Sequence, residues 1–335
     1  MDELQHTLGN DNGMVVVILP YGATLQRWTA PDRNGAWDDI VLGYDTVAEY
    51  RQGSACFGST VGRYANRIAN GRFAYAGTAY QLEINSGRHH LHGGTCGFDK
   101  RIWEVQRSSR AHIEMCLTSP AGEAGYPGKL IASVTYTLDQ SNQLRIDYRA
   151  TTTRATPVNL TNHSYFNLAG QGNGDVLDHQ LTLKSNRFTP VDSELIPTGE
   201  IRSVDDSPMD FRSPTRIGAH INSDDPQIRY GEGYDHNWVI ERESKQPKLA
   251  AAVFEPVTGR ILETYTTEPG IQFYTGNHIQ PNTKGKDGKS YGSRSGFCLE
   301  TQCFPDSPNK PMFPSTILQP GETYESTTIY RLGVD

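Results

Sequence analysis

The most unusual set of polar side chains in this sequence lies in the stretch Asn159–Gly170, which reads NLTNHSYFNLAG. If this stretch forms a β-strand, its side chains alternate between two faces, and the odd-numbered positions from Asn159 to Asn167 share one face. That face can form hydrogen bonds at nearly every position, yet it carries no Lys, Arg, Asp or Glu. Neutral donors and acceptors around one imidazole suit a small polyhydroxylated ligand, and histidine exchanges a proton near neutral pH. The alternative is that His163 is a buried structural histidine whose ring nitrogens form hydrogen bonds with neighbouring side chains or backbone groups.

A second candidate for proton chemistry is the glutamate in GFCLETQCFPDSPN. In a strand, Glu300 shares one face with Gln302 and Cys298, so that face does not resemble an ordinary solvated one. The carboxylate of such a glutamate is either paired with another side chain for structural reasons or serves as a general base. In IQFYTGN, Gln272 and Tyr274 likewise share one face of a short predicted strand.

Three further motifs leave a structural and a functional interpretation open. GRYANRIANG contains Arg63 and Arg67, whose guanidinium groups can hold vicinal hydroxyls or a carboxylate, or can serve the structure alone. HHLHGG places His90 and His92 on one side of a strand, as metal sites often do. The cysteines are not placed as co-ligands, however, and such a loop can bind a ligand without an ion. In YDHNWVI, Asp235 either accepts hydrogen bonds from sugar hydroxyls or closes an Asx-turn.

The elements that must position these residues are predicted to be short strands from end to end. Runs of β-branched or alternating residues occupy Met14–Leu19, Leu130–Leu138, Gln143–Arg149 and Tyr324–Leu332. The one helix predicted is brief, at Thr46–Gln52. The 33 glycines and 19 prolines supply the many turns that such a chain needs.

The 335 residues show no internal repeat, linker or composition shift, so residues 1–335 are predicted to form a single domain. The expected fold class is all-β, as one large antiparallel β-sandwich with many loops and very little helix. The charged, proline-spaced segment Ser203–Asp225 and the GKDGKS loop near Gly285 are predicted to be surface excursions.

Composition excludes several classes of partner. With 36% hydrophobic and 21% charged residues and a net charge of −7, the sequence has no basic run for nucleic acid. It also has no apolar run near the ~18 residues that a membrane span needs. Five scattered cysteines without a CxxC pattern predict reduced thiols. Overlapping glycosylation sequons begin at Asn159 and Asn162, and a secretory route would expose both to modification. The predicted location is therefore cytoplasmic.

Taken in order, the motifs resemble those of the aldose 1-epimerases, also called galactose mutarotases. The resemblance rests on GRYANRIANGRF, LHGG followed by GFDK, NLTNHSYFNLAG, LIPTGEI, YDHNWV, IQFYTGN and ETQCFPDSPN. The opening NDNGMVVVILPYGATLQRW and the closing PGETYESTTIYR extend it over nearly the whole chain. The resemblance implies a galactose mutarotase-like supersandwich whose concave face holds one free sugar. It also implies interconversion of the α- and β-anomers of aldohexoses such as D-galactose and D-glucose.

The resemblance also implies a role for individual residues. His163 matches the general acid of the family and Glu300 its general base. The positions that match the family's sugar-binding residues are Asn66, Arg67, His92, Asp235 and Gln272, with Ser164 and Tyr165 flanking the acid. No cofactor, metal or nucleotide is implied. The expected partner is a small monosaccharide, and the chain is either a monomer or a homodimer.

Three rival functions make different demands on the sequence. A carbohydrate-binding module has no use for an acid and a base that converge on one carbon. A glycoside hydrolase usually needs two carboxylates across the scissile bond, whereas the natural partner of Glu300 here is a histidine. A mutarotase of sugar phosphates should show additional Arg or Lys residues directed at the phosphate.

Overall fold

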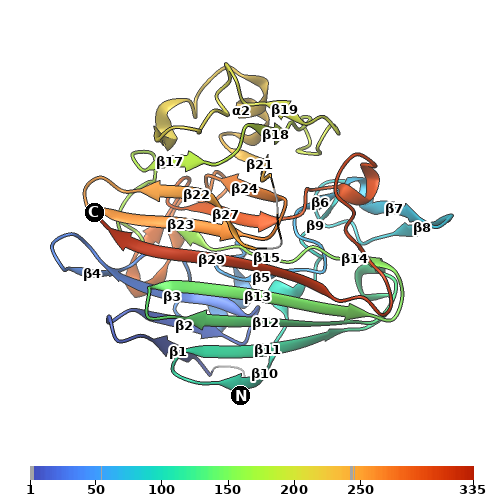
Figure 1. Ribbon diagram of the computed structural model, residues 1–335, viewed down its shortest axis with the longest axis horizontal. Coiled ribbons are helices and arrows are strands. Elements are labelled where there is room, and N and C mark those ends of the chain that lie inside the picture. The colour runs from blue at the N-terminus through green and yellow to red at the C-terminus, as the bar shows by residue number, and fades with distance from the viewer. Residues whose placement is uncertain (1–3, 54, 242–243, 245) are drawn as a thin grey trace.

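β-Strands make up most of the regular structure of this chain (Figure 1). The structure, a computed structural model, describes residues 4–53, 55–241, 244 and 246–335. In those residues the α-helices are α1 (Val47–Gln52) and α2 (Pro226–Gly231). The first is the predicted helix, capped by the side chain of Thr46. The second was not predicted, although Asp225 before Pro226 is a recognised helix start. The all-β class with very little helix is confirmed.

The largest layer is a nine-stranded antiparallel sheet that crosses the molecule in Figure 1. In spatial order its strands are β10 (Glu104–Ser108), β11 (His112–Ser119), β12 (Leu130–Leu138), β13 (Gln143–Thr152), β29 (Tyr324–Val334), β23 (Arg260–Thr266), β22 (Lys248–Phe254), β17 (Gln180–Leu183) and β20 (Thr215–Arg216). The sequence predicted β12, β13 and β29. The last two extend beyond their predicted ends.

A six-stranded antiparallel sheet carries four of the nine predicted site residues, Tyr165, Asp235, Gln272 and Glu300. In order its strands are β16 (Tyr165–Phe166), β27 (Phe297–Gln302), β24 (Gly270–Tyr274), β21 (Asp235–Val239), β18 (Arg187–Thr189) and β19 (Arg202–Ser203). Every residue of β24 and β27 is buried. Successive side chains of a strand point to opposite faces, so Phe297 and Leu299 face the core while Cys298 and Glu300 face the other way.

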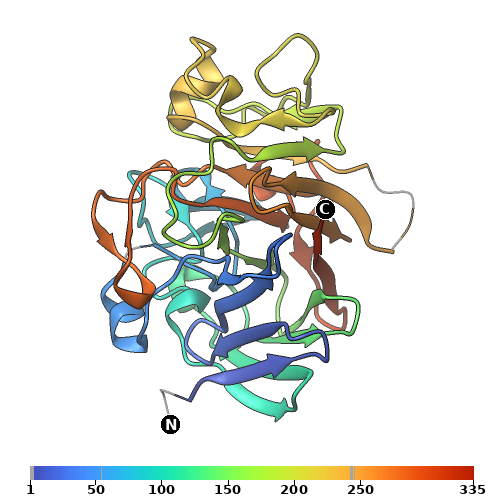
Figure 2. The ribbon, with the colours of Figure 1, turned by 90° about the vertical axis from the view of Figure 1, so that its left-hand side faces the viewer.

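The remaining strands form one small sheet and several pairs. The four-stranded sheet contains β1 (His6–Gly9), β2 (Val15–Leu19), β3 (Thr24–Pro31) and β4 (Trp37–Asp39). The pairs are β5 (Thr60–Val61) with β15 (Thr161–Asn162), β6 (Arg67–Ile68) with β9 (His90–Leu91), β7 (Arg72–Tyr75) with β8 (Thr78–Gln81), β14 (Thr156–Pro157) with β28 (Ile317–Leu318), and β25 (Thr283–Lys284) with β26 (Ser290–Tyr291). In Figure 2 the orange segment of β25 and β26 lies beside the blue α1, where Lys284 Nζ is 2.7 Å from Glu49 Oε1.

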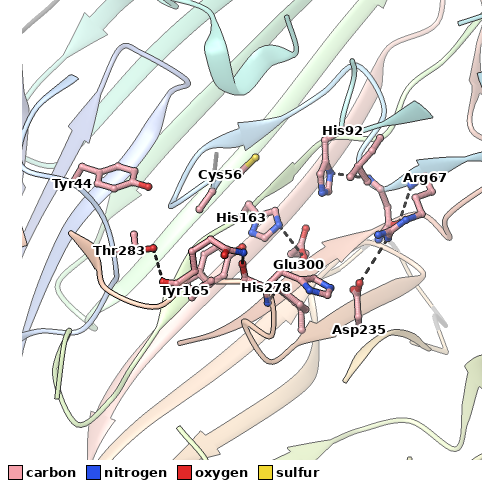
Figure 3. A pocket seen from close by; sticks show the side chains of 16 residues that line it. Tyr44, Cys56, Arg67, His92, His163, Tyr165, Asp235, His278, Thr283 and Glu300 are labelled. Carbon is pink, nitrogen blue, oxygen red and sulfur yellow. Dashed lines mark hydrogen bonds and ion pairs between the residues drawn. The ribbon is translucent and has the colours of Figure 1, made fainter. Parts of the chain in front are cut away.

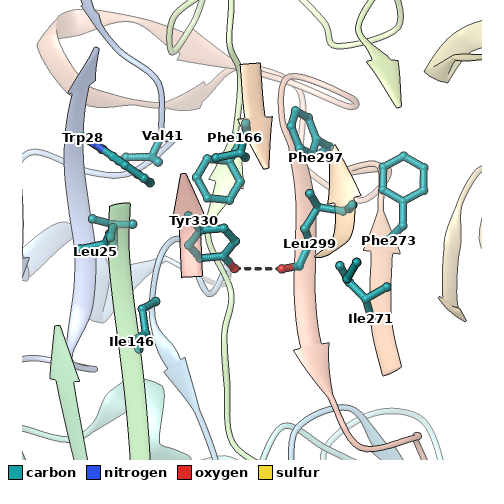
Figure 4. Close-up of a cluster of buried hydrophobic side chains, with 14 of the residues drawn as sticks. Leu25, Trp28, Val41, Ile146, Phe166, Ile271, Phe273, Phe297, Leu299 and Tyr330 are labelled. Atoms are coloured by element: carbon teal, nitrogen blue, oxygen red, sulfur yellow. Dashed lines mark hydrogen bonds between the residues drawn. The ribbon is translucent and has the colours of Figure 1, made fainter. Parts of the chain in front are cut away.

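One buried cluster of apolar side chains joins these sheets (Figure 4). The ring centroids of Phe166 and Tyr330 are 5.1 Å apart at 62°, an edge-on contact that aromatic rings favour. The Tyr330 hydroxyl donates a hydrogen bond of 2.9 Å to the Leu299 carbonyl, so β29 holds β27 directly. Phe297 lies against the same cluster. The strand that carries Glu300 is thus fixed from its core side.

The stretch Asn159–Gly170 is not one continuous strand, so that prediction is wrong. Its paired segments β15 and β16 are separated by His163 and Ser164. The side-chain oxygen of Asn162 accepts hydrogen bonds from the Ser164 amide (3.1 Å) and hydroxyl (2.6 Å). Such local side-chain bonds compete with the regular ladder. The chain therefore switches from pairing with β5 to pairing with β27, and the break places His163 between the two sheets.

The segment Ser203–Asp225 is not a simple surface excursion. Met209, Phe211 and Ile217 are buried in the main apolar cluster, with exposed fractions of 1%, 1% and 0%. The charges and prolines that suggested a surface loop lie between these apolar anchors. The prediction failed because Met209 and Phe211 are two residues apart but Ile217 follows six residues later, so the three apolar residues do not form a sustained helix or strand period.

Arg63 has a structural role. Its guanidinium group is buried and donates hydrogen bonds to the Ser119 hydroxyl (2.8 Å) and to the carbonyls of Ser119, Pro120, Pro127 and Gly128 (2.7–3.2 Å). These acceptors lie in the connection between β11 and β12. Arg63 therefore fastens the GRYANRIANG segment to the nine-stranded sheet.

Replacing Arg63 by Met should lower the free energy of unfolding by about 3 kcal/mol or more, because several buried carbonyls lose their donor. Urea denaturation followed by circular dichroism measures this change. The control is Arg107→Met, since the Arg107 side chain is 79% exposed and forms a surface ion pair. Equal midpoints for the two variants would contradict the role given to Arg63.

Candidate active site

A cavity of about 260 Å³ opens on the face of the six-stranded sheet that points away from the core (Figure 3). Of the nine residues predicted for the site, seven line it: Asn66, Arg67, His92, His163, Tyr165, Asp235 and Glu300. The other two, Ser164 and Gln272, do not. The Ser164 hydroxyl donates to Asn162, and Gln272 stands behind Asp235, to which it donates a hydrogen bond.

His163 and Glu300 face each other at this cavity. The break between β15 and β16 positions His163, and β27 positions Glu300. His163 Nε2 is 3.6 Å from Glu300 Oε1, and their side chains are only 7% and 3% exposed. Glu300 Oε2 is buried and has no hydrogen-bond partner within the described residues. The pair therefore retains hydrogen-bonding capacity for a ligand.

Burial changes the proton affinity of both groups. Desolvation lowers the pKa of His163 to about 4, although a hydrogen bond to its own backbone and the Asp235 carboxylate oppose this shift. Desolvation also raises the pKa of Glu300 well above its ordinary value; Asp235 adds to this shift and Arg67 opposes it. Both shifts favour the uncharged forms.

Arg67 and Asp235 form the opposite wall of the cavity. Arg67 Nη1 is 3.7 Å from Asp235 Oδ2, and Gln272 Nε2 donates a hydrogen bond of 2.7 Å to Asp235 Oδ1. The Asp235 carboxylate thus contacts two side chains and does not act as an Asx-turn acceptor in any hydrogen bond of the described residues. Asn66 Oδ1 accepts a hydrogen bond of 2.8 Å from the Arg67 amide. A carboxylate and a guanidinium group in this position suit adjacent hydroxyls.

His92 is a neutral member of the cavity. Its Nδ1 accepts a hydrogen bond of 3.1 Å from the Asn66 amide, so the neutral ring carries its proton on Nε2. Burial lowers the pKa of His92 well below its ordinary value, and the nearby His163 and Arg67 act in the same direction. The ring centroids of His92 and His163 are 5.3 Å apart. His92 therefore supplies an N–H donor whose charge does not change near neutral pH.

The other histidines of HHLHGG serve the structure. His90 lies between the Glu83 carbonyl (2.6 Å) and the Tyr126 hydroxyl (2.7 Å), and His89 Nδ1 accepts a backbone N–H at 3.0 Å. Of the three histidines in this motif, only His92 lines the cavity, so the three imidazoles do not converge as a metal site would require. In the described part of the chain, one group of side chains has metal-like spacing: His163, Cys298 and Glu300.

Several lining residues were missed by sequence reasoning. Tyr274 is one of them, and its ring meets His163 edge-on at 6.4 Å. It lies near the predicted Tyr165, which stacks on His163 with centroids 5.0 Å apart and 15° between the rings. The side-chain alternation in IQFYTGN was the signal for Tyr274. The other missed residues are Tyr44, Ala55, Cys56, Leu91, His278, Ile279, Gln280 and Thr283. These stand on irregular connections or in short, isolated pairs, where no periodic pattern indicates a direction.

A buried ion pair anchors the rim of the cavity. Residues 278–283 belong to the connection 275–296 between β24 and β27. In this connection the side chain of Lys286 is only 1% exposed, and its ammonium group is 2.6 Å from Asp39 Oδ2 and donates to the Gln26 carbonyl. The prediction that the GKDGKS loop is a surface excursion is therefore wrong for Lys286. The lysine ties the rim to the four-stranded sheet.

The fold and the site together define a class: an all-β protein with a buried histidine–glutamate pair in a cavity of hydrogen-bonding side chains. The model of one family, aldose 1-epimerase, matches residues 5–331. The chain belongs to the aldose 1-epimerase family, and the resemblance seen in the motifs is confirmed.

Relatives and solved structures agree with this family. Galactose mutarotase from Bos taurus is 47% identical over 319 residues, which cover 95% of this chain and 91% of that protein. The structure of an aldose epimerase homologue from C. elegans superposes with a TM-score of 0.89 at 33% identity and covers 99% of both chains. A galactose 1-epimerase from Lactobacillus acidophilus gives a TM-score of 0.85 at 30% identity, over 98% of this chain and 93% of that one. In the described part of the chain, neither α-helix has the length and apolar character needed to cross a membrane.

The direction of the His163 shift predicts a neutral imidazole in the free protein at pH 6. Nitrogen-15 NMR of the histidine rings should show the His163 signals of the neutral form at that pH, with titration near pH 4. The variant His163→Asn assigns the signals by their disappearance. A titration midpoint above pH 6 would show that the cavity stabilises the imidazolium instead.

Proposed function

We propose that the chain interconverts the α- and β-anomers of free aldohexoses such as D-galactose and D-glucose. The observation that carries this proposal is the pair His163 and Glu300, 3.6 Å apart at the cavity. In a cyclic aldose the C1 hydroxyl oxygen and the ring oxygen are bonded to the same carbon. Two proton-exchanging groups that are neighbours can therefore serve both oxygens at once. The name of the Bos taurus relative, galactose mutarotase, supports the same reaction.

Ring opening requires two proton transfers. Glu300, as general base, takes the proton of the C1 hydroxyl while the C1–O1 bond becomes a carbonyl. The bond between C1 and the ring oxygen breaks, and His163, as general acid, gives the ring oxygen its proton. Rotation about the C1–C2 bond then presents the other carbonyl face, and the reverse transfers close the ring as the opposite anomer. Each positioned transfer contributes about 10²–10⁴-fold.

The active form of the pair carries one proton in total. With two protons there is no base, and with none there is no acid. The burial shifts favour a neutral imidazole and a protonated carboxyl, so the proposed cycle requires the proton to lie on His163 instead of Glu300 when the sugar is bound. Both arrangements hold the same number of protons, and the pair therefore titrates as a unit.

The remaining polar residues hold the sugar while C1 turns. Arg67 with Asn66, His92 and Asp235 bind hydroxyls and the ring oxygen. Gln272, which the sequence assigned as a direct contact, acts through its hydrogen bond to Asp235. Tyr165 supplies a flat wall beside the acid, and Ser164 fixes the bend that presents His163.

The rival functions fit this cavity less well. The nearest proton-exchanging partner of Glu300 is a histidine, whereas a glycoside hydrolase needs a second carboxylate across the bond. Of the lining residues, Arg67 alone is an arginine or lysine, and its guanidinium faces Asp235, so a phosphate group has no cationic subsite of its own. A binding module does not require the buried pair at all.

We further propose one domain over residues 1–335 in a cytoplasmic protein with a monosaccharide as its partner. The main apolar cluster draws residues from Leu8 to Leu332, which supports a single domain. The sequon residues Asn159 and Asn162 are 0% and 2% exposed, so glycans there would be incompatible with the fold. We expect neither nucleic acid nor a membrane as a partner, and either a monomer or a homodimer.

Glu300→Gln keeps the size of the side chain but cannot accept the proton, so kcat should fall by at least about 10²-fold in a polarimetric assay with fresh α-D-galactose. His163→Asn should have a similar effect. Because the two groups act in one step, the double variant should be far less impaired than the product of the single losses. The wild-type kcat/KM should be bell-shaped in pH, since only the form with one proton is active. Activity of Glu300→Gln within a few-fold of wild type would reduce Glu300 to a structural carboxylate.

Mutarotase activity should also survive exhaustive treatment with EDTA, because two proton transfers need no Lewis acid. Activity is compared before chelation, after chelation and dialysis, and after addition of zinc or manganese. Loss on chelation followed by recovery with one of the metals would assign a catalytic metal, for which His163, Cys298 and Glu300 have suitable spacing.

A further inference from the structure

A chain of side-chain hydrogen bonds leads from the interior to the cavity wall. Gln302 Nε2 donates to Gln272 Oε1 at 3.2 Å, and Gln272 Nε2 donates to Asp235 Oδ1 at 2.7 Å. The chain ends at Arg67, whose Nη1 is 3.7 Å from Asp235 Oδ2. A dashed line marks this ion pair in Figure 3. Its members come from the neighbouring strands β27, β24 and β21 and from β6. Only Asp235 and Arg67, at its outer end, line the cavity.

Burying the polar side chain of Gln302 costs free energy of folding. It is 0% exposed, and its Oε1 has no hydrogen-bond partner within the described residues. An apolar side chain of the same size would fill the space without leaving a buried acceptor unpaired. Packing alone therefore does not explain a glutamine here, whereas its donated hydrogen bond to Gln272 does.

The amide N–H that Gln302 donates determines the orientation of the Gln272 side-chain amide. A glutamine amide can turn by half a rotation, which exchanges its oxygen and nitrogen. While Gln302 donates to Gln272 Oε1, the Gln272 nitrogen must face Asp235. In the turned orientation, the Gln272 oxygen would face the Asp235 carboxylate, and two acceptors would repel each other. Asp235 would then lose its neutral donor and shift from its place opposite Arg67.

We propose that Gln302 is a positioning residue for sugar binding, acting through Gln272 on Asp235. It touches neither the sugar nor the reacting atoms. Its effect is to hold the Asp235 carboxylate where it accepts hydrogen bonds from sugar hydroxyls. This inference rests on the proposed mutarotase function, and it adds to that function a residue buried behind the cavity.

The test replaces Gln302 by Met, which keeps the length of the side chain and removes the donor. Because the lost bond positions a hydroxyl-binding group, KM for galactose should rise by about three- to tenfold with kcat within about twofold of wild type. The matched control is Gln227→Met. Gln227 is also a buried glutamine, but its amide binds the Val191 backbone outside the cavity. This control should lower the melting temperature and leave KM unchanged.

A double-mutant cycle with Gln272→Ala separates positioning from general destabilisation. If Gln302 acts through Gln272, then Gln302→Met should raise KM no further once Gln272 is absent. Independent effects would multiply instead, and that result would overturn the inference. A loss in kcat with KM unchanged would also overturn it, because that pattern indicates displacement of Glu300, two residues away on β27.

A second variant keeps the test open if Gln302→Met does not fold. Gln302→Glu has nearly the same shape, but its ionised form can only accept hydrogen bonds. The ratio of its KM to that of wild type should therefore rise with pH as the carboxyl ionises, and a constant ratio of one would contradict the inference. The wild-type enzyme serves as the reference in the same assay. A wild-type chain without mutarotase activity refutes the proposed function, whereas an active wild type with unchanged Gln302 variants refutes only this inference.

Discussion

The free-energy cost of burying Glu300 beside His163 is the constraint on which the rest of the site depends. A carboxylate and an imidazolium that are both buried lose their hydration, which costs free energy. Here His163 Nε2 and Glu300 Oε1 are 3.6 Å apart. Burial reduces this cost by favouring the uncharged form of each group. Arg67 favours the ionised carboxyl, while Asp235 opposes it.

The geometry of the pair is only as fixed as the strand that carries Glu300. On its core side, β27 contributes Phe297 and Leu299 to the main apolar cluster, and Tyr330 from the nine-stranded sheet bonds to the Leu299 carbonyl. Close packing of this kind transmits the rigidity of the core to the opposite face of the strand. The same six residues thus hold the two layers together and present Glu300 to the cavity.

The cationic side chains near the site have two different roles: some anchor irregular segments, and one lines the cavity. Arg63 and Lys286 are buried, and their hydrogen bonds go mainly to backbone carbonyls and, for Lys286, to Asp39. Arg67, only four residues after Arg63, lines the cavity opposite Asp235. The anchors fix irregular segments that have no long ladder of their own. Those segments in turn carry Arg67 and the rim, so the structural cations determine where the binding groups stand.

The sequence alone determined the all-β class, the long strands, the family and the residues proposed for proton transfer, because each depends on a local period or on motifs in a fixed order. Only the tertiary structure decided that Arg63 is an anchor while Arg67 lines the cavity, and that Tyr44, His278 and Thr283 reach it. It also decided that His163 stands at a break, since the Asn162 side chain removes the chain from its ladder there. Alternation predicts the face of a side chain only while the strand stays regular. Loops that meet across more than a hundred residues leave no period in the sequence, and their contacts exist only once the chain has folded.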